Sequence, residues 1–245
     1  MQHYDDVIIG GIPIEIIRKK NLKNLYIRIN PPDGCVVVSS PMETRIEDLK
    51  LFVIRKLPEI TKVRERMISQ DRQAEREYVS GESHYLWGKV YKLQVITGGN
   101  RYHIEKAPNK IVMKVPDGAS VQSREKAMTE WYREELKRVL SGVIERCEKK
   151  SGICAREYKI KNMKTRWGTC NIPSSRIWIN LQLAKKPIEC LEFVVMHELT
   201  HLVEKNHTHR FYALMDESLP TWRDAKKILS EYPLDHLAVG DYDDE

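Results

Sequence analysis

The chain has 245 residues, of which 41% are hydrophobic and 31% are charged, with 41 Lys and Arg against 35 Asp and Glu. This length and hydrophobic content suffice for one large domain or two small ones with a packed core. No segment approaches the roughly 20 apolar residues that a membrane-spanning helix needs, so the sequence predicts no membrane partner.

Charge and cysteine content indicate the setting of the protein. The segment after residue 234 holds five acids and no Lys or Arg, so residues 1–234 carry an excess of 41 minus 30, or +11. Such an excess permits an anionic partner such as nucleic acid but does not specify one. The five cysteines form no C-x-x-C pair. We therefore expect no disulfide framework and a reducing, cytoplasmic location.

β-branched residues and alternating polarity predict strands in the first part of the chain. Strands are expected at residues 12–20, 24–30 and 35–40, as a hairpin over 84–96, and at 111–116. Two more strands are expected at 158–167 and 176–183, joined by a loop of sequence GTCNIPSS.

Apolar residues at helical spacing predict helices between these strands. Over residues 42–77, Leu49, Val53, Leu57 and Ile60 share one face. A long helix is expected from a capping Ser123 to about Lys150, where Ser-Gly follows. Later helices are expected over 188–205, after Pro187, and then over 208–219 and 221–232.

These elements predict an α+β fold in two lobes. Residues 1–118 form a β-rich N-terminal lobe with helices, and residues 119–234 form a C-terminal lobe that holds the helix after Pro187. The segment PDGAS, residues 116–120, is the expected linker, and residues 235–245 form an acidic tail.

The sequence HELTH at residues 197–201 lies within an otherwise apolar segment. Residues four apart in a helix lie on the same face, so His197 and His201 present two imidazoles to one point. Imidazole nitrogen binds Zn²⁺ at about 2.0–2.1 Å. Glu198 is displaced from such an ion but can reach a water beside it, as the general base of a hydrolase.

A catalytic zinc needs a third protein ligand and one open position. In a continuous helix Glu204 lies about 10 Å along the axis from His197, too far for both to bind one ion. The third ligand is therefore expected after Asn206, which tolerates the left-handed conformation that ends helices. His207 follows it and is favoured, with His209 as the competitor. The spacing matches the metzincin pattern, but that pattern has Gly where Glu204 stands, which disfavours a metzincin.

Several motifs resemble the YgjP-like family of predicted zinc metallopeptidases, which is related to the SprT-like and WLM proteases. They are the W-G-T-C stretch, a strand with an Asn, a Pro-initiated helix with HELTHL, and NHTHRF. The positions in register are Trp167, Gly168, Thr169, Cys170, Asn180, Pro187, His197, Glu198, His201, Asn206, His207 and Phe211. The resemblance covers roughly residues 10 to 232 and departs at His209, where relatives often carry another residue.

The resemblance implies a zincin-like catalytic lobe in which His197, His201 and His207 hold Zn²⁺ and Glu198 is the base for hydrolysis of a peptide or protein. The W-G-T-C stretch is expected to shape a tight turn under the site, without a catalytic role for Cys170. The segment RIWINLQL, residues 176–183, is the nearest candidate edge on which a peptide could add as a strand.

Two other functions are consistent with the sequence. The segment 156–166 has five Lys or Arg and one Glu, which permits a DNA- or nucleoprotein-associated factor of SprT-like kind with gated or no proteolysis. An inactive, zinc-stabilised scaffold is disfavoured, because a structural site closes all four positions and has no use for a base such as Glu198.

Overall fold

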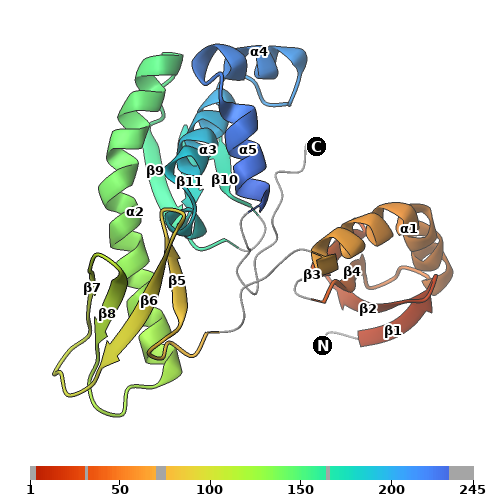
Figure 1. The fold of residues 1–245 in the computed structure, drawn as a ribbon. Coiled ribbons are helices and arrows are strands. Elements are labelled where there is room, and N and C mark those ends of the chain that lie inside the picture. The colour runs from red at the N-terminus through yellow and green to blue at the C-terminus, as the bar shows by residue number, and fades with distance from the viewer. Residues whose placement is uncertain (1–3, 31–32, 70–75, 164–165, 232–245) are drawn as a thin grey trace. The chain divides into compact units, whose positions relative to one another are not determined.

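The computed structural model describes residues 4–30, 33–69, 76–163 and 166–231 (Figure 1). The predicted α+β fold is confirmed: the N-terminal region is β-rich, the described residues contain five α-helices, and the C-terminal region is helical and rich in histidine. The chain divides into two compact units between residues 74 and 75. The acidic tail expected at 235–245 lies outside the described residues.

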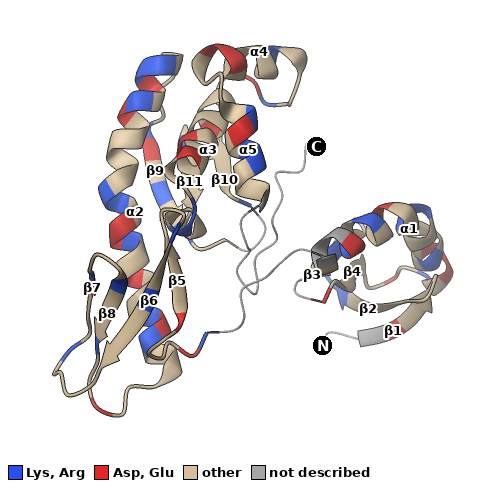
Figure 2. Ribbon diagram, in the orientation of Figure 1, with Lys and Arg blue, Asp and Glu red and all other residues tan. Residues whose placement is uncertain are grey.

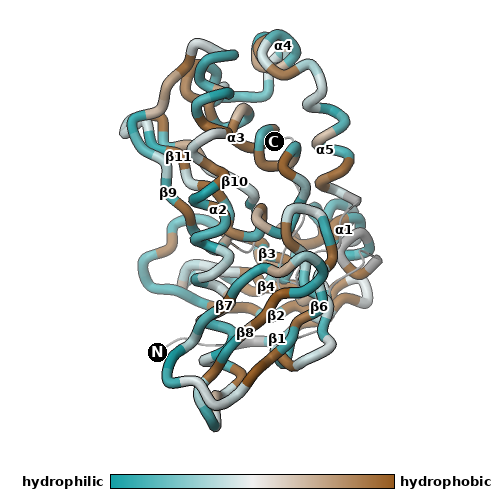
Figure 3. Tube along the Cα trace, turned by 60° about the vertical axis from the view of Figure 1, so that its left-hand side comes forward, coloured by the Kyte–Doolittle hydropathy of each residue, from teal (hydrophilic) through white to brown (hydrophobic). Residues whose placement is uncertain are grey.

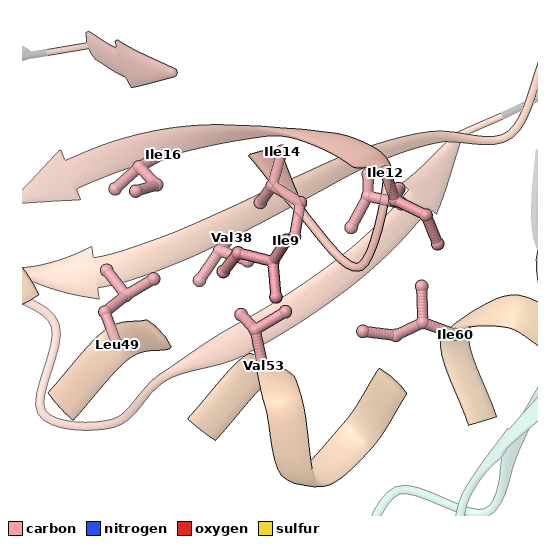
Figure 4. Close-up of a cluster of buried hydrophobic side chains, with 9 residues drawn as sticks. Ile9, Ile12, Ile14, Ile16, Val38, Leu49, Val53 and Ile60 are labelled. Carbon is pink, nitrogen blue, oxygen red and sulfur yellow. The ribbon is translucent and has the colours of Figure 1, made fainter. Parts of the chain in front are cut away.

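The N-terminal unit is a four-stranded sheet with a helix on one face. Its strands are β1 (Tyr4–Ile9), β2 (Ile12–Lys19), β3 (Tyr26–Asn30) and β4 (Cys35–Pro41), in the order β1-β2-β4-β3, and its helix is α1 (Ile46–Ser69). The predicted apolar face of the helix is confirmed, because Leu49, Val53 and Ile60 are buried in one cluster with Ile14 and Val38 of the sheet (Figure 4). The strand β1 was not expected from the sequence.

The second unit contains two sheets. The first has strands β5 (Ser83–Leu86), β6 (Lys89–Ile96), β7 (His103–Lys106) and β8 (Lys110–Lys114), in the order β5-β6-β8-β7. The second has β9 (Glu157–Lys161), β10 (Gly168–Asn171) and β11 (Arg176–Asn180), in the order β10-β11-β9. In each sheet one neighbouring pair is parallel, β6 with β8 and β11 with β9.

The first half of the expected loop GTCNIPSS is a strand. Residues 168–171 form β10, which pairs antiparallel with β11, and the chain reverses through Ser175 at φ 48°. The strand β11 therefore lies in the centre of its sheet, and the expectation that it offers a free edge is wrong. Among the strands that the structure describes, β10 and β9 are the edges of this sheet.

The helices of the second unit surround one buried helix. They are α2 (Val121–Ser151), α3 (Ile188–Thr200), α4 (His209–Ser218) and α5 (Trp222–Glu231), with a short 3₁₀ helix η1 (Leu181–Lys185) before α3. Ten of the 13 residues of α3 are buried, since α2, α4, α5, β10 and β11 all contact it. Figure 3 shows hydrophobic residues along α3 and β8. The apolar segment around HELTH is thus central to the unit.

The long helix α2 begins earlier than the sequence predicted. Ser120 is its cap, because its Oγ accepts a hydrogen bond from the N–H of Ser123. The helix ends as expected at Gly152, which has a left-handed φ of 68°. Lys, Arg, Asp and Glu are spread along α2 (Figure 2). None of the helices in the described ranges is long and apolar enough to cross a membrane.

The division of the chain falls near residue 74, whereas the sequence predicted a boundary at 118. The sheet β5–β8 is tied to the helical part of the second unit by hydrogen bonds. The backbone N–H of Trp87 donates to the carbonyl of Ala184 at 2.9 Å, and the hydroxyl of Tyr132 donates to the carbonyl of Tyr85 at 2.8 Å. Residues 116–120 therefore join β8 to α2 inside this unit.

Candidate metal centre

The last turn of α3 places two histidines and a glutamate at one end of the buried helix. His197 is 6% exposed and Glu198 is 3% exposed. His201 caps the helix in a right-handed conformation, and its N–H donates to the carbonyl of His197 at 3.2 Å. The helix thus ends five residues earlier than expected, and Asn206 is not among the described residues with positive φ.

Three imidazoles converge where the chain turns back after α3. The Nε2 atom of His197 lies 3.0 Å from that of His201 and 3.1 Å from that of His207. Two nitrogens on a tetrahedral zinc with bonds of about 2.0–2.1 Å are about 3.3–3.4 Å apart, so a shift of a few tenths of an ångström fits the ion. Three imidazoles are also the donor set of a catalytic zinc, which keeps its fourth position for water or substrate.

Burial keeps His197 and His201 in the state that a metal requires. Burial, assisted by the neighbouring His201 and His207, lowers the pKa of His197 to about 2. Burial also lowers the pKa of His201. A histidine ligand must be neutral with a free lone pair, so a depressed pKa favours metal binding near neutral pH.

Backbone and aromatic groups orient the rings. Nδ1 of His201 lies 3.1 Å from the carbonyl oxygen of Glu204, which favours the tautomer with the proton on Nδ1 and the lone pair on Nε2. Glu204 therefore contacts this group through its backbone. The buried ring of Phe211 lies under the three imidazoles, with centroids 5.0, 4.8 and 4.7 Å from those of His197, His201 and His207.

Glu198 faces β10. A Cβ atom on Gly168 would lie 2.6 Å from Oε1 of Glu198, so the side chain occupies the space that any larger residue at 168 would need. Burial raises the pKa of Cys170 to about 11, and the charge of Glu198 adds to this. The Cys170 thiol is therefore protonated at neutral pH. Gly168, Thr169 and Cys170 lie in the edge strand β10 beside Glu198, after a bend at Trp167, so the expectation that they form a tight turn is wrong.

The structure brings together three of the four histidines weighed from the sequence. His209 is exposed as the first residue of α4 and lies outside the triad. Sequence reasoning missed the contact of Gly168 with Glu198. A glycine inside a strand often marks close approach by another group, and this was the available signal.

The basic segment 156–166 forms β9 and the start of the following loop, with Lys164 outside the described residues. The Lys159 ammonium pairs with Glu157 at 2.9 Å and lies over the ring of Trp178. A nucleic-acid partner stays a prediction.

Comparison with known families defines the class of the protein. The model described as YgjP-like, metallopeptidase domain matches residues 23–232, so the chain carries a metallopeptidase domain. It belongs to the YgjP-like family, which confirms the resemblance found in its motifs.

A solved structure, the metallopeptidase zymogen of Pyrococcus abyssi abylysin, is similar at 15% identity and a TM-score of 0.34, over 36% of this chain and 89% of that one. Curated protein sequences contain no significant match.

Proposed function

We propose that the protein is a zinc-dependent peptidase in which His197, His201 and His207 hold the ion and Glu198 is the general base. The observation that carries the proposal is the convergence of the three Nε2 atoms, with separations of 3.0 and 3.1 Å from His197, beside a buried carboxylate from the same helix. A purely structural site would not need that carboxylate.

The roles of the residues follow from their positions. When bound, Zn²⁺ supplies a Lewis acid that lowers the pKa of water toward about 7 and polarises a carbonyl. Glu198 accepts the proton of the attacking water and then delivers it to the departing amine. The Nδ1 contact of His201 with the carbonyl of Glu204 and the ring of Phe211 keep the imidazoles aimed at one point.

We further propose that an extended peptide binds by adding to the edge strand β10. This strand has one neighbour, β11, among the described strands, and it passes beside Glu198 at Gly168. Main-chain hydrogen bonds to a sheet edge hold a peptide with little regard to its sequence. A scissile bond placed there lies next to the base.

Metal analysis and a cleavage screen test the proposal together. Purified wild type should contain about one zinc per chain and should cleave a proteome-derived peptide library. Glu198→Gln should keep the zinc and lose cleavage by at least about 10²-fold, the typical contribution of a general base. Glu189→Gln is the matched control and should retain activity, because Glu189 lies exposed in the first turn of the same helix, away from the triad. Equal cleavage by wild type and Glu198→Gln would refute the proposal.

A further inference from the structure

We infer that Gly168 is a positioning residue for Glu198, because the missing side chain at 168 is the space in which the carboxylate is held. This inference rests on the proposed function, in which Glu198 is the base. The three atoms nearest to a Cβ at 168 all belong to Glu198: Oε1 at 2.6 Å, Cγ at 2.7 Å and Cδ at 2.9 Å. Real Cβ atoms essentially never approach other atoms so closely.

The glycine is required for space and not for backbone conformation. Eight other glycines of the described residues have positive φ, as turns demand. Gly168 is not one of them, since it pairs in a regular strand with Ile179. Alanine could therefore adopt its backbone conformation, and the three closest contacts of an added methyl group are all with Glu198.

The strand β10 is held in place beside α3 by its partner strand and by buried hydrogen bonds. Its partner Ile179 is fully buried, and the N–H of Asn180 donates to the carbonyl of Trp167 at 2.8 Å. The side-chain amide of Asn180, itself 3% exposed, donates to the carbonyls of Met163 and Arg166 at 2.9 and 2.6 Å. These bonds fix the residues just before Gly168.

The helix that carries Glu198 is equally constrained. Val194, Val195 and Leu199 are completely buried around it, and protein interiors are close-packed. An added methyl group at 168 must then be accommodated by the Glu198 side chain itself. The carboxylate would rotate away from the position in which it accepts a proton, while no imidazole atom is among the three nearest neighbours of the new group.

Kinetics of Gly168→Ala test the positioning role. We expect kcat for the most rapidly cleaved library peptide to fall about 10²-fold, as for a misplacement of about 1 Å. The zinc content and KM should stay within about twofold of wild type, which a general loss of structure would not allow. Gly99→Ala is the matched control, since its Cβ would meet its nearest atom at 3.4 Å. An unchanged kcat in Gly168→Ala overturns the inference.

A double-mutant cycle, read out as the urea midpoint of unfolding, tests the contact between residue 168 and Glu198 without a measurement of activity or of bound metal. Glu198→Ala removes the three atoms that conflict with a Cβ at 168. Gly168→Ala should therefore lower the urea midpoint of wild type but not that of Glu198→Ala. If Gly168→Ala alone fails to fold, the double variant should still fold. Equal shifts in both backgrounds, or a double variant that also fails to fold, overturn the inference. Absence of zinc or cleavage in wild type refutes the proposed function, while the cycle still decides whether Gly168 holds Glu198.

Discussion

At the scale of single residues, burial converts ordinary histidines into candidate metal ligands. His197 is nearly inaccessible and has a pKa lowered to about 2, mainly by loss of water and then by its two neighbouring imidazoles. A protonated imidazole at this buried position would destabilise the fold. A neutral imidazole whose nitrogen binds a metal ion together with the other histidines is therefore favoured. The same burial that makes His197 unfavourable for a proton leaves its nitrogen free for a metal ion.

A substitution of Phe211 tests how far metal binding depends on packing around the triad. We expect Phe211→Leu to weaken zinc binding about 10–100-fold, the range found when groups that orient metal ligands are changed. The reason is that the ring contacts all three imidazoles, with centroid separations of 4.7 to 5.0 Å. Chelator competition measures the affinity. Phe52→Leu is the matched control, because Phe52 is a partly buried ring packed against the N-terminal core. If it weakens zinc binding equally, the role of Phe211 is refuted.

The triad could be predicted because its three histidines lie close together in the sequence, on and just after one helix. The spacing of His197 and His201 follows from helical geometry, and His207 from the expectation that the helix ends before it. The orientation of Glu198 could not be predicted, because Gly168 lies 30 residues earlier and meets it only through tertiary packing. A glycine that a strand needs because a neighbouring side chain occupies the space cannot be distinguished in the sequence from a glycine that a turn needs.

At the scale of elements, periodic segments were predictable and short paired ones were not. The helices α1, α2 and α3 have apolar residues at helical spacing, which packing then confirms. The strands β7 (HIEK) and β10 (GTCN) have four residues each and little apolar content. Their conformation comes from pairing with β8 and β11, which no local pattern records.

The sheet β5–β8 carries a histidine that makes stability depend on pH. His84 is 3% exposed, and burial, with the charge of Arg76, lowers its pKa to about 4. The unfolded chain, with an ordinary pKa of 6.5, binds more protons between these values. Stability is therefore fully present above pH 6.5 and is lost as pH falls toward 4. Between pH 7.5 and 5.0 we expect His84 to account for about 2 kcal/mol of the loss.

Urea unfolding of His84→Gln at both pH values checks this contribution. The variant should lose less stability than wild type on acidification, by about the amount assigned to His84. His103→Gln is the control, because the side chain of His103 in β7 is 57% exposed. The same loss in wild type and His84→Gln would show that the buried imidazole is not the group responsible.

At the scale of the whole molecule, the triad and the tryptophans belong to one compact unit and not to the other. His197, His201 and His207 lie in the unit that begins at residue 75, and so do all five tryptophans, at positions 87, 131, 167, 178 and 222. The N-terminal unit has its own core of Ile and Val residues between its sheet and α1. A ligand that binds only the native triad raises the free energy of unfolding of the unit that contains the triad.

Removal of zinc should therefore be visible by tryptophan fluorescence and nearly invisible in the N-terminal core. With zinc at 100 times its dissociation constant, binding stabilises the native second unit by about 2.7 kcal/mol, and a chelator removes this. We expect chelation to lower the fluorescence-detected thermal midpoint by several degrees. Hydrogen exchange at the amides of Ile14 and Val38, which are buried in the N-terminal cluster, should change little because that cluster contains no residue of the triad. Equal loss of protection in the N-terminal core would mean that the two units unfold as one, and an unchanged midpoint would mean that the triad does not bind zinc.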